Sequence, residues 1–161
     1  MTPTDLIEKF YSSFAKRDAE GMVSCYHEQI RFSDPAFPNL EPREARGMWR
    51  MLCGRAQDLK VEFSDVQASG DAGSAHWEAY YTFSATGRKV HNIIDAEFRF
   101  ADGKIIEHTD RFDFARWTRQ ALGLPGILLG WTPIVQNKVR AQARAGLEAH
   151  LQKHPEAGEP A

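Results

Sequence analysis

Apolar residues recur at helical spacing at the start of the chain. Over residues 6–14 they return every three or four positions, which predicts an amphipathic helix with Thr4 as its N-cap. A second, short helix is predicted after Asp18, whose carboxylate is suited to cap it, and a third over residues 44–53. The first third of the chain is therefore expected to be mostly helical.

In the middle of the chain the period changes from 3.6 to 2. Alternating runs separated by glycine-containing turns predict a brief strand at residues 30–33 and four longer ones near residues 61–66, 75–83, 90–100 and 104–114. Helices followed by an antiparallel or mixed sheet indicate an α+β fold, with three N-terminal helices packed on one face of a curved sheet. Such a sheet leaves a hollow under the helices, and we expect function there.

The last part of the chain returns to helix. Helices are predicted near residues 115–121 and from Thr132 onward, because the Pro that follows Thr132 is favoured at the first helical position. The apolar stretch 122–131 between them contains Gly and Pro, and it is far shorter than the ~20 residues of a membrane span. Residues 115–161 are therefore interpreted as a helical extension of the domain formed by residues 1–114.

Basic residues surround this apolar stretch. Between residues 111 and 147 there are six Lys or Arg and one acid. An exposed apolar segment must be covered by something, which favours a homodimer contact or a lid over the hollow. Peripheral contact with an anionic membrane is the alternative interpretation, and it is not the preferred one.

Composition narrows the classes of function. The chain has 161 residues, with 20 Lys+Arg against 22 Asp+Glu, so it lacks the basic excess typical of proteins that bind nucleic acid. Cys25 and Cys53 have no metal or redox spacing, and the N-terminus lacks a secretory pattern. We therefore expect a cytoplasmic protein. Because no HExxH, Walker or Rossmann motif occurs, no metal, nucleotide or other cofactor is expected.

The Asp-Gly turn at residues 102–103 decides which side chains of the last two strands face inward. A two-residue turn would pair Ala101 with Lys104, whereas a three-residue turn with a glycine bulge would pair Phe100 with Lys104. A slip of one residue inverts a strand, and only the second register separates an apolar face from a charged one. We therefore adopt the bulged register.

In this register His108 and Asp110 are the two polar residues among seven apolar ones on the inward face, and Ile105 joins the outer face. A buried polar group without a partner costs roughly 1–3 kcal/mol, so the pair needs partners or a purpose. A histidine beside a carboxylate on an apolar surface can serve as general base and orienting partner. A polar pair that only fixes the strand register fits equally well, and the residues alone leave both interpretations open.

Aromatic residues are abundant for a domain of this size, with 10 Phe, 4 Trp and 4 Tyr. Those at inward positions are expected to line a pocket for a small apolar ligand, although plain core is an alternative. The predicted pocket residues are Phe10, Phe14, Tyr26, Trp49, Trp77, Tyr81, Phe98 and Phe112.

Asp34 precedes a proline, where its carboxylate either takes part in chemistry or only bonds nearby backbone amides.

Three stretches resemble the nuclear-transport-factor-2-like superfamily, in particular its SnoaL-like and ketosteroid-isomerase-like branches. They are Phe-Tyr-Ser-Ser-Phe at residues 10–14, Ile-Arg-Phe-Ser-Asp-Pro at residues 30–35, and the run from residue 98 to residue 108 around the Asp-Gly-Lys turn. The resemblance covers about residues 5–114. It implies a cone, in which a curved sheet and three helices enclose a deep apolar pocket, usually in a dimer.

The resemblance also implies roles for single residues. In the isomerase branch the aspartate before the proline is the proton-shuttling base, and that position is Asp34 here. The isomerase tyrosine falls on Phe10, with Tyr11 turned by ~100° around the helix, and its second aspartate falls on Asp95, which the bulged register sends outward. Steroid isomerisation is therefore not expected.

In the SnoaL-like cyclases the strand after an Asp-Gly-Lys turn carries a cavity-facing histidine and then a catalytic aspartate. His108 and Asp110 match those positions. We therefore expect an enzyme that performs acid/base chemistry without a cofactor, such as isomerisation, cyclisation, dehydration or addition of water to an epoxide. Asp110 would be the base, His108 its partner and Asp34 a second acid/base group. The alternative is a non-catalytic binding or dimeric interaction module that docks through its C-terminal extension.

Overall fold

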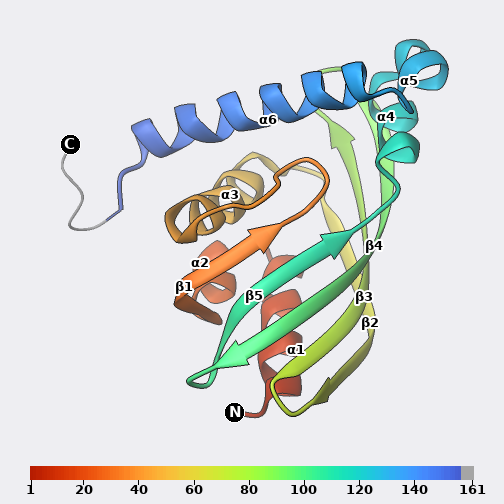
Figure 1. Ribbon diagram of the computed structural model, residues 1–161. Helices are drawn as coiled ribbons and strands as arrows, with labels where there is room; N and C mark the ends of the chain where they lie inside the picture. Colours follow the sequence, from red (N-terminus) through yellow and green to blue (C-terminus); the bar gives the residue numbers. More distant parts are fainter. Residues whose placement is uncertain (157–161) are drawn as a thin grey trace.

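The computed structural model describes residues 1–156 of the chain. Its sheet has the strand order β1-β5-β4-β3-β2. The strands are β1 (Tyr26–Ser33), β2 (Lys60–Ser69), β3 (Ala72–Phe83), β4 (Arg88–Ala101) and β5 (Lys104–Arg111). Only β1 and β5 run parallel, so the sheet is mixed, and it is open rather than closed into a barrel. Figure 1 shows the sheet curving around the N-terminal helices, which confirms the predicted α+β architecture.

Three helices precede or interrupt the first strands, as predicted: α1 (Pro3–Ala15), α2 (Ala19–Val23) and α3 (Pro42–Arg55). Asp18 caps α2 by accepting a hydrogen bond from the Gly21 amide. The predicted cap of α1 is wrong, because Thr2 rather than Thr4 is the N-cap. Thr2 exchanges side-chain and backbone hydrogen bonds with Asp5 in a capping box, which satisfies two amides that a later start would leave exposed.

The hairpin between β4 and β5 differs from the predicted bulged register, but it leaves His108 and Asp110 on the inward face as predicted. Ala101 pairs with Lys104 across a two-residue turn, in which both central residues have positive φ (53° and 73°). The bulge lies further along, because Arg99 pairs with Glu107 while Phe100 pairs with Ile105. This bulge restores the inward direction of the later residues of β5. The two-residue turn, by pairing Ile105 with Phe100, places Ile105 in the core, where it is fully buried, contrary to the predicted outer position.

The core fills the space between the sheet and the first three helices. Its largest fully buried side chains come from α1, β1 and α3, including Phe10, Tyr11, Phe32 and Trp49. A second, smaller cluster lies at the other end of the sheet and joins Val90, Phe114, Trp117, Ala121 and Val139. Residues that pack against both clusters connect them, so the interior is continuous.

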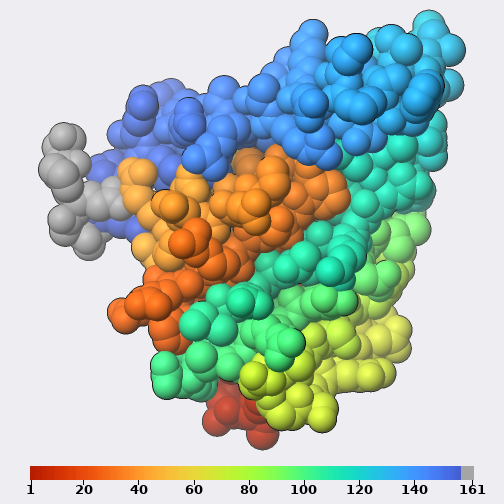
Figure 2. Space-filling view, viewed as in Figure 1, coloured from red at the N-terminus to blue at the C-terminus, as the bar shows by residue number. Residues whose placement is uncertain are grey.

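The C-terminal extension contains three helices, α4 (Phe114–Leu122), α5 (Leu124–Leu129) and α6 (Pro133–Lys153). The glycines and the proline of the 122–131 stretch do not prevent a helix there. Gly123, with a φ of 70°, ends α4, and α5 starts after it in a new direction. Figures 1 and 2 show α6 crossing over α3 and the adjacent end of the sheet. No helix in the described part of the chain is long and apolar enough to cross a membrane.

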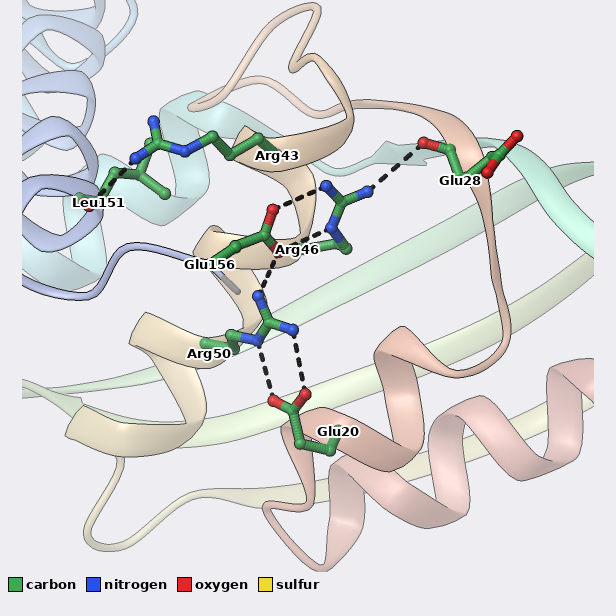
Figure 3. A network of polar contacts seen from close by, with 7 residues as sticks. All are labelled: Glu20, Glu28, Arg43, Arg46, Arg50, Leu151 and Glu156. Atoms are coloured by element: carbon green, nitrogen blue, oxygen red, sulfur yellow. Dashed lines mark hydrogen bonds and ion pairs between the residues drawn. The ribbon is translucent and has the colours of Figure 1, made fainter. Parts of the chain in front are cut away.

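Ion pairs hold the segment that follows α6 against α3. Glu156 accepts bidentate hydrogen bonds from Arg46 on α3 at 2.7 and 2.8 Å, and Arg50 joins Glu156 to Glu20 on α2 (Figure 3). The last five residues of the predicted extension, 157–161, lie outside the described residues. Helix α6 is therefore tied to α3, and through Arg50 to α2.

Candidate functional site

His108 and Asp110 lie on the inner face of β5, as predicted, although the strand register that puts them there differs from the predicted one. Their strand partners are Phe98 and Ala96 on β4. His108 is fully buried and Asp110 is 3% exposed. The sheet therefore holds an imidazole and a carboxylate side by side inside the aromatic core.

A hydrogen-bonded chain runs through His108 from a helix to a strand. The indole Nε1–H of Trp49 on α3 donates to the Tyr26 hydroxyl oxygen at 2.8 Å, and that hydroxyl lies 2.7 Å from His108 Nδ1. On the other side of the ring, Nε2 lies 2.9 Å from Asp110 Oδ1. Because the indole can only donate, the Tyr26 hydroxyl proton is directed to Nδ1. With the Tyr26 hydroxyl donating to Nδ1, the Nε2–H of His108 donates to Asp110 Oδ1.

Asp110 is held by two donors that leave half of its carboxylate open. His108 Nε2 and Trp77 Nε1, the latter at 3.3 Å, both bond to Oδ1. Among the described residues no donor bonds to Oδ2. The carboxylate thus has a fixed orientation and one oxygen free to accept a proton.

Asp34 supplies a second carboxyl group in the same region. It follows β1, and its Oδ1 accepts hydrogen bonds from the amides of Ala36 and Phe37 at 2.7 and 2.6 Å. Burial raises the pKa of Asp34 to about 7, and the nearby charge of Asp110 adds to this effect, while the two backbone bonds oppose it. Asp34 therefore makes the Asx turn, and its part in acid/base chemistry stays a prediction.

The predicted pocket aromatics form two groups. Six are buried in the main core around the histidine: Phe10, Phe14, Tyr26, Trp49, Trp77 and Phe98. Tyr81 and Phe112 are partly buried and pack against both clusters of the core. Burial raises the pKa of Tyr81 to about 12, and Asp34 is near enough to contribute to the shift. That these residues line a ligand pocket stays a prediction.

Ring contacts surround His108 on several sides. Its ring centroid lies 4.5 Å from that of Phe98, 5.0 Å from Phe32, 5.3 Å from Phe10 and 6.2 Å from the stacked ring of Trp49. The surface of the described residues has a hollow of about 450 Å³ over the outer face of β2–β5 and another of about 210 Å³ at the hairpin end. Of the candidate site residues only Phe98 lines the larger hollow, and neither hollow is lined by His108, Asp110 or Asp34.

Sequence reasoning did not find several partners of the site. The hydroxyl of Tyr11 is fully buried and makes no hydrogen bond to any described residue. Burial raises the pKa of Tyr11, and Asp110 is close enough to raise it further. Helical geometry places Tyr11 about 100° around the helix from Phe10, and it could not show that both side chains are fully buried. Asp95, by contrast, is exposed and bonds to His76, as the predicted outward position requires.

Trp49 and Trp77 were predicted as pocket lining. In the structure their indole N–H groups donate at the two ends of the hydrogen-bonded chain, to Tyr26 and to Asp110. No periodicity signals a contact between a helix and a strand that are distant in sequence. Within residues 1–156, no group of three or more His, Cys, Asp or Glu is arranged to hold a metal ion.

Comparison with known proteins assigns the chain to a family. The family model for the SnoaL-like domain matches residues 7–108. The chain belongs to the SnoaL-like family. The match ends within β5, so α4, α5 and α6 lie beyond it. Comparison with curated protein sequences gives no match.

Solved structures support the same fold. An NTF2-like protein of unknown function from Burkholderia pseudomallei is 18% identical with a TM-score of 0.65, over 74% of this chain and 98% of that one. IdmH, a candidate polyketide cyclase from Streptomyces antibioticus, is 22% identical with a TM-score of 0.64, over 77% and 100%. An epoxide hydrolase from M. tuberculosis is 18% identical with a TM-score of 0.62, over 78% and 94%. At these identities the likeness concerns the fold alone.

Proposed function

We propose that this SnoaL-like protein catalyses acid/base chemistry without a cofactor on a small, largely apolar molecule that carries a carbonyl, epoxide or hydroxyl group. The observation that carries the proposal is the buried chain from Trp49 through Tyr26 and His108 to Asp110, which fixes one carboxylate oxygen and leaves the other free. A preorganised base in an apolar interior suits proton transfer from carbon or water.

Asp110 is the general base in this proposal. Its Oδ2 takes a proton from the substrate, while the donors on Oδ1 keep the carboxylate in place. The same proton returns to another atom of the substrate or goes to a leaving oxygen, so no external acid is consumed. His108 acts as the orienting partner, since one ring nitrogen contacts Asp110 and Tyr26 occupies the other.

Asp34 and Tyr11 complete the proposed set. With a pKa of about 7, Asp34 is half protonated near neutral pH and so can donate a proton where Asp110 accepts one. The buried Tyr11 hydroxyl, which has no partner among the described residues, is a donor for a substrate oxygen. Isomerisation, cyclisation, dehydration and addition of water to an epoxide all need this combination of acid and base.

The second candidate function is a non-catalytic module that binds an apolar ligand. It is favoured by the close ring packing around His108, where several aromatic centroids lie within 6.2 Å. A polar chain inside such a core specifies the register of β5 without any turnover. The two candidates differ in whether Asp110 matters for chemistry or only for folding.

Two simple probes test the proposal. Exchange of the α-protons of 2-tetralone in D₂O, followed by NMR, reports on proton abstraction next to a carbonyl, and hydrolysis of styrene oxide reports on epoxide opening. We expect the wild-type protein to accelerate at least one of them. Asp110→Asn keeps the shape of the side chain and should lower that rate by ~10²-fold or more.

Asp95→Asn is the matched control, because Asp95 lies on the outer face of β4 beside the strand partner of Asp110. It should leave the rate unchanged. Equal rates for Asp110→Asn and wild type would refute the catalytic role. Saturable binding of both probes without acceleration of either would support the binding module instead.

A further inference from the structure

The end of the molecule around α5 presents a cluster of apolar side chains to solvent. We define the apolar tip as Leu124, Ile127, Leu128, Leu129, Trp131 and Ile134. Each of these side chains is between 52% and 82% exposed. Figures 1 and 2 show α5 and the start of α6 projecting at one corner, away from the body of the cone. Isolated exposed leucines are common in proteins, but six large apolar residues within eleven positions form a patch that calls for a partner.

The packing of α5 fixes this exposure. Helix α5 lies against α4 through Gly126 and Gly130, both of which are buried. A Cβ added to either glycine would collide with Thr118 on α4, so no larger side chain fits on that side. The helix therefore buries its glycines and turns its leucines and isoleucine outward, the reverse of ordinary core packing. These side chains do not cover the cone, and the lid interpretation does not describe this arrangement.

Charge around the apolar tip selects the kind of partner. No Asp or Glu occurs between residues 114 and 147, whereas Arg119 and Lys138 flank the tip and are both exposed. Arg88 of β4 also reaches its base, where Nε donates to the Gln120 carbonyl at 2.8 Å. The surface that borders the apolar tip is therefore basic.

A symmetric contact with a second copy fits this charge pattern poorly. In such a contact the same patch meets itself, so the flanking cations of one copy would approach those of the other. An anionic lipid surface instead offers opposite charge at the rim and hydrocarbon at the centre. A tryptophan at the edge of an apolar tip is also typical of the membrane interface.

We propose that the apolar tip is a docking element for an anionic membrane, with Leu128 and its neighbours entering the acyl region and Arg119 and Lys138 contacting lipid headgroups. The contact is peripheral and reversible, because α5 spans only Leu124–Leu129 and anchors nothing across the bilayer. The proposal does not depend on the catalytic function, since none of its residues belongs to the acid/base set.

Vesicle sedimentation with the full-length protein tests the proposal. The protein should sediment with vesicles of phosphatidylcholine and phosphatidylglycerol, bind pure phosphatidylcholine vesicles roughly tenfold more weakly, and be released by about 0.5 M salt. Leu128→Asp should reduce binding roughly tenfold or more. Ile93→Asp is the matched control, because Ile93 is also exposed, at 40%, but lies on the outer face of the sheet. It should bind like wild type.

Tryptophan fluorescence gives a second readout. Trp49, Trp77 and Trp117 are at most 9% exposed, whereas Trp131 is 70% exposed. A blue shift on addition of anionic vesicles should therefore come from Trp131 and disappear in Trp131→Phe. Equal binding to neutral and anionic vesicles, no binding, or equal losses for Leu128→Asp and Ile93→Asp would each overturn the proposal. Self-association in the absence of lipid that Leu128→Asp abolishes would assign the tip to a second copy and also overturn it.

Discussion

At the scale of single residues, ionisation of Asp34 opposes folding. Its pKa rises from an ordinary 3.8 to about 7 in the folded state, so the folded protein holds this proton more tightly than the unfolded chain. Stability attributable to Asp34 is therefore present at low pH and lost as the pH rises from about 4 to about 7. The full shift corresponds to roughly 4 kcal/mol at most.

Asp34→Asn removes this titration and keeps an oxygen for the Ala36 and Phe37 amides. We predict that the variant gains stability relative to wild type as the pH is raised from 5 to 8, by about 1–4 kcal/mol. Urea unfolding at both pH values measures the difference. A constant difference between the two proteins would show that Asp34 ionises as freely in the folded state as in the unfolded chain.

Tyr26 has a role that a second buried tyrosine lacks. Both Tyr26 and Tyr81 accept a hydrogen bond from a tryptophan, but only Tyr26 also contacts a ring nitrogen of His108. Tyr26→Phe and Tyr81→Phe should each cost about 1–3 kcal/mol, because each leaves an indole N–H unpaired. Only Tyr26→Phe should alter the His108 tautomer, as measured by ¹⁵N NMR of the side chain. An unchanged His108 spectrum in Tyr26→Phe would contradict the orienting role.

At the scale of elements, close approach of α3 and α6 depends on Gly47. A Cβ at this position would collide with the Leu151 side chain of α6, which is buried. Gly54, in the same helix, has no neighbouring atom within 4 Å of such a Cβ. Gly47→Ala should therefore lower stability by about 1–3 kcal/mol through overpacking. Gly54→Ala should raise it by up to about 1 kcal/mol, since alanine favours helix.

Thermal unfolding of the two glycine variants compares them directly. The same substitution in one helix is expected to act in opposite directions, which isolates packing from helix propensity. If both variants gained stability, Leu151 would have to move aside at no cost, and the contact between α3 and α6 would not constrain either helix.

The elements also show where sequence patterns lose their predictive power. Period and turn residues predicted the helices other than α5, the long strands and the inward position of His108 and Asp110. They put the bulge in the turn, although it lies where Ile106 has no partner on β4. Asp102 and Gly103 both adopt the positive φ that a two-residue turn requires. The bulge after Ile105 then returns the later residues of β5 to their predicted faces. Local patterns fix which side chains share a face, whereas the place of an extra residue depends on the packing of Ile105.

In the candidate site too, local patterns predicted which side chains share a face but not the contacts that depend on packing. Spacing along β5 predicted the histidine and the carboxylate, because both lie on one strand. The contacts that orient them come from α3, β1 and β3, at sequence separations of up to 82 residues. Such partners depend on tertiary packing, which one sequence does not encode in any periodic form. Dimerisation and cytoplasmic location stay predictions.

At the scale of the whole molecule, α6 connects the apolar tip to the rest of the protein. Arg140 donates to the Pro35 carbonyl at 2.7 Å and lies over the Phe114 ring, so the helix also contacts the loop that carries Asp34. Its far end is held by Glu156 (Figure 3). The extension is therefore an integrated part of the fold on both sides of the cone.

Glu156 should contribute measurably to that attachment. Hydrogen bonds from Arg46 and Arg50 lower the pKa of Glu156 from 4.5 to about 2. A carboxylate with a lowered pKa stabilises the folded state above its unfolded value, so this contribution is complete above pH 4.5 and lost as the pH falls through about 2. Glu156→Gln should cost about 1–3 kcal/mol at pH 7, because the pair is partly shielded from solvent.

Glu148→Gln provides the control, since Glu148 makes an exposed ion pair with Arg144 within α6 itself. It should change stability by less than about 0.5 kcal/mol. Urea unfolding at pH 7 and pH 3 measures both variants, and the deficit of Glu156→Gln should shrink at the lower pH. Amide hydrogen exchange should localise the change to the last turns of α6, near Leu147 and Leu151, which are buried against α3. A deficit equal to that of Glu148→Gln would mean that apolar packing alone holds α6 on the cone.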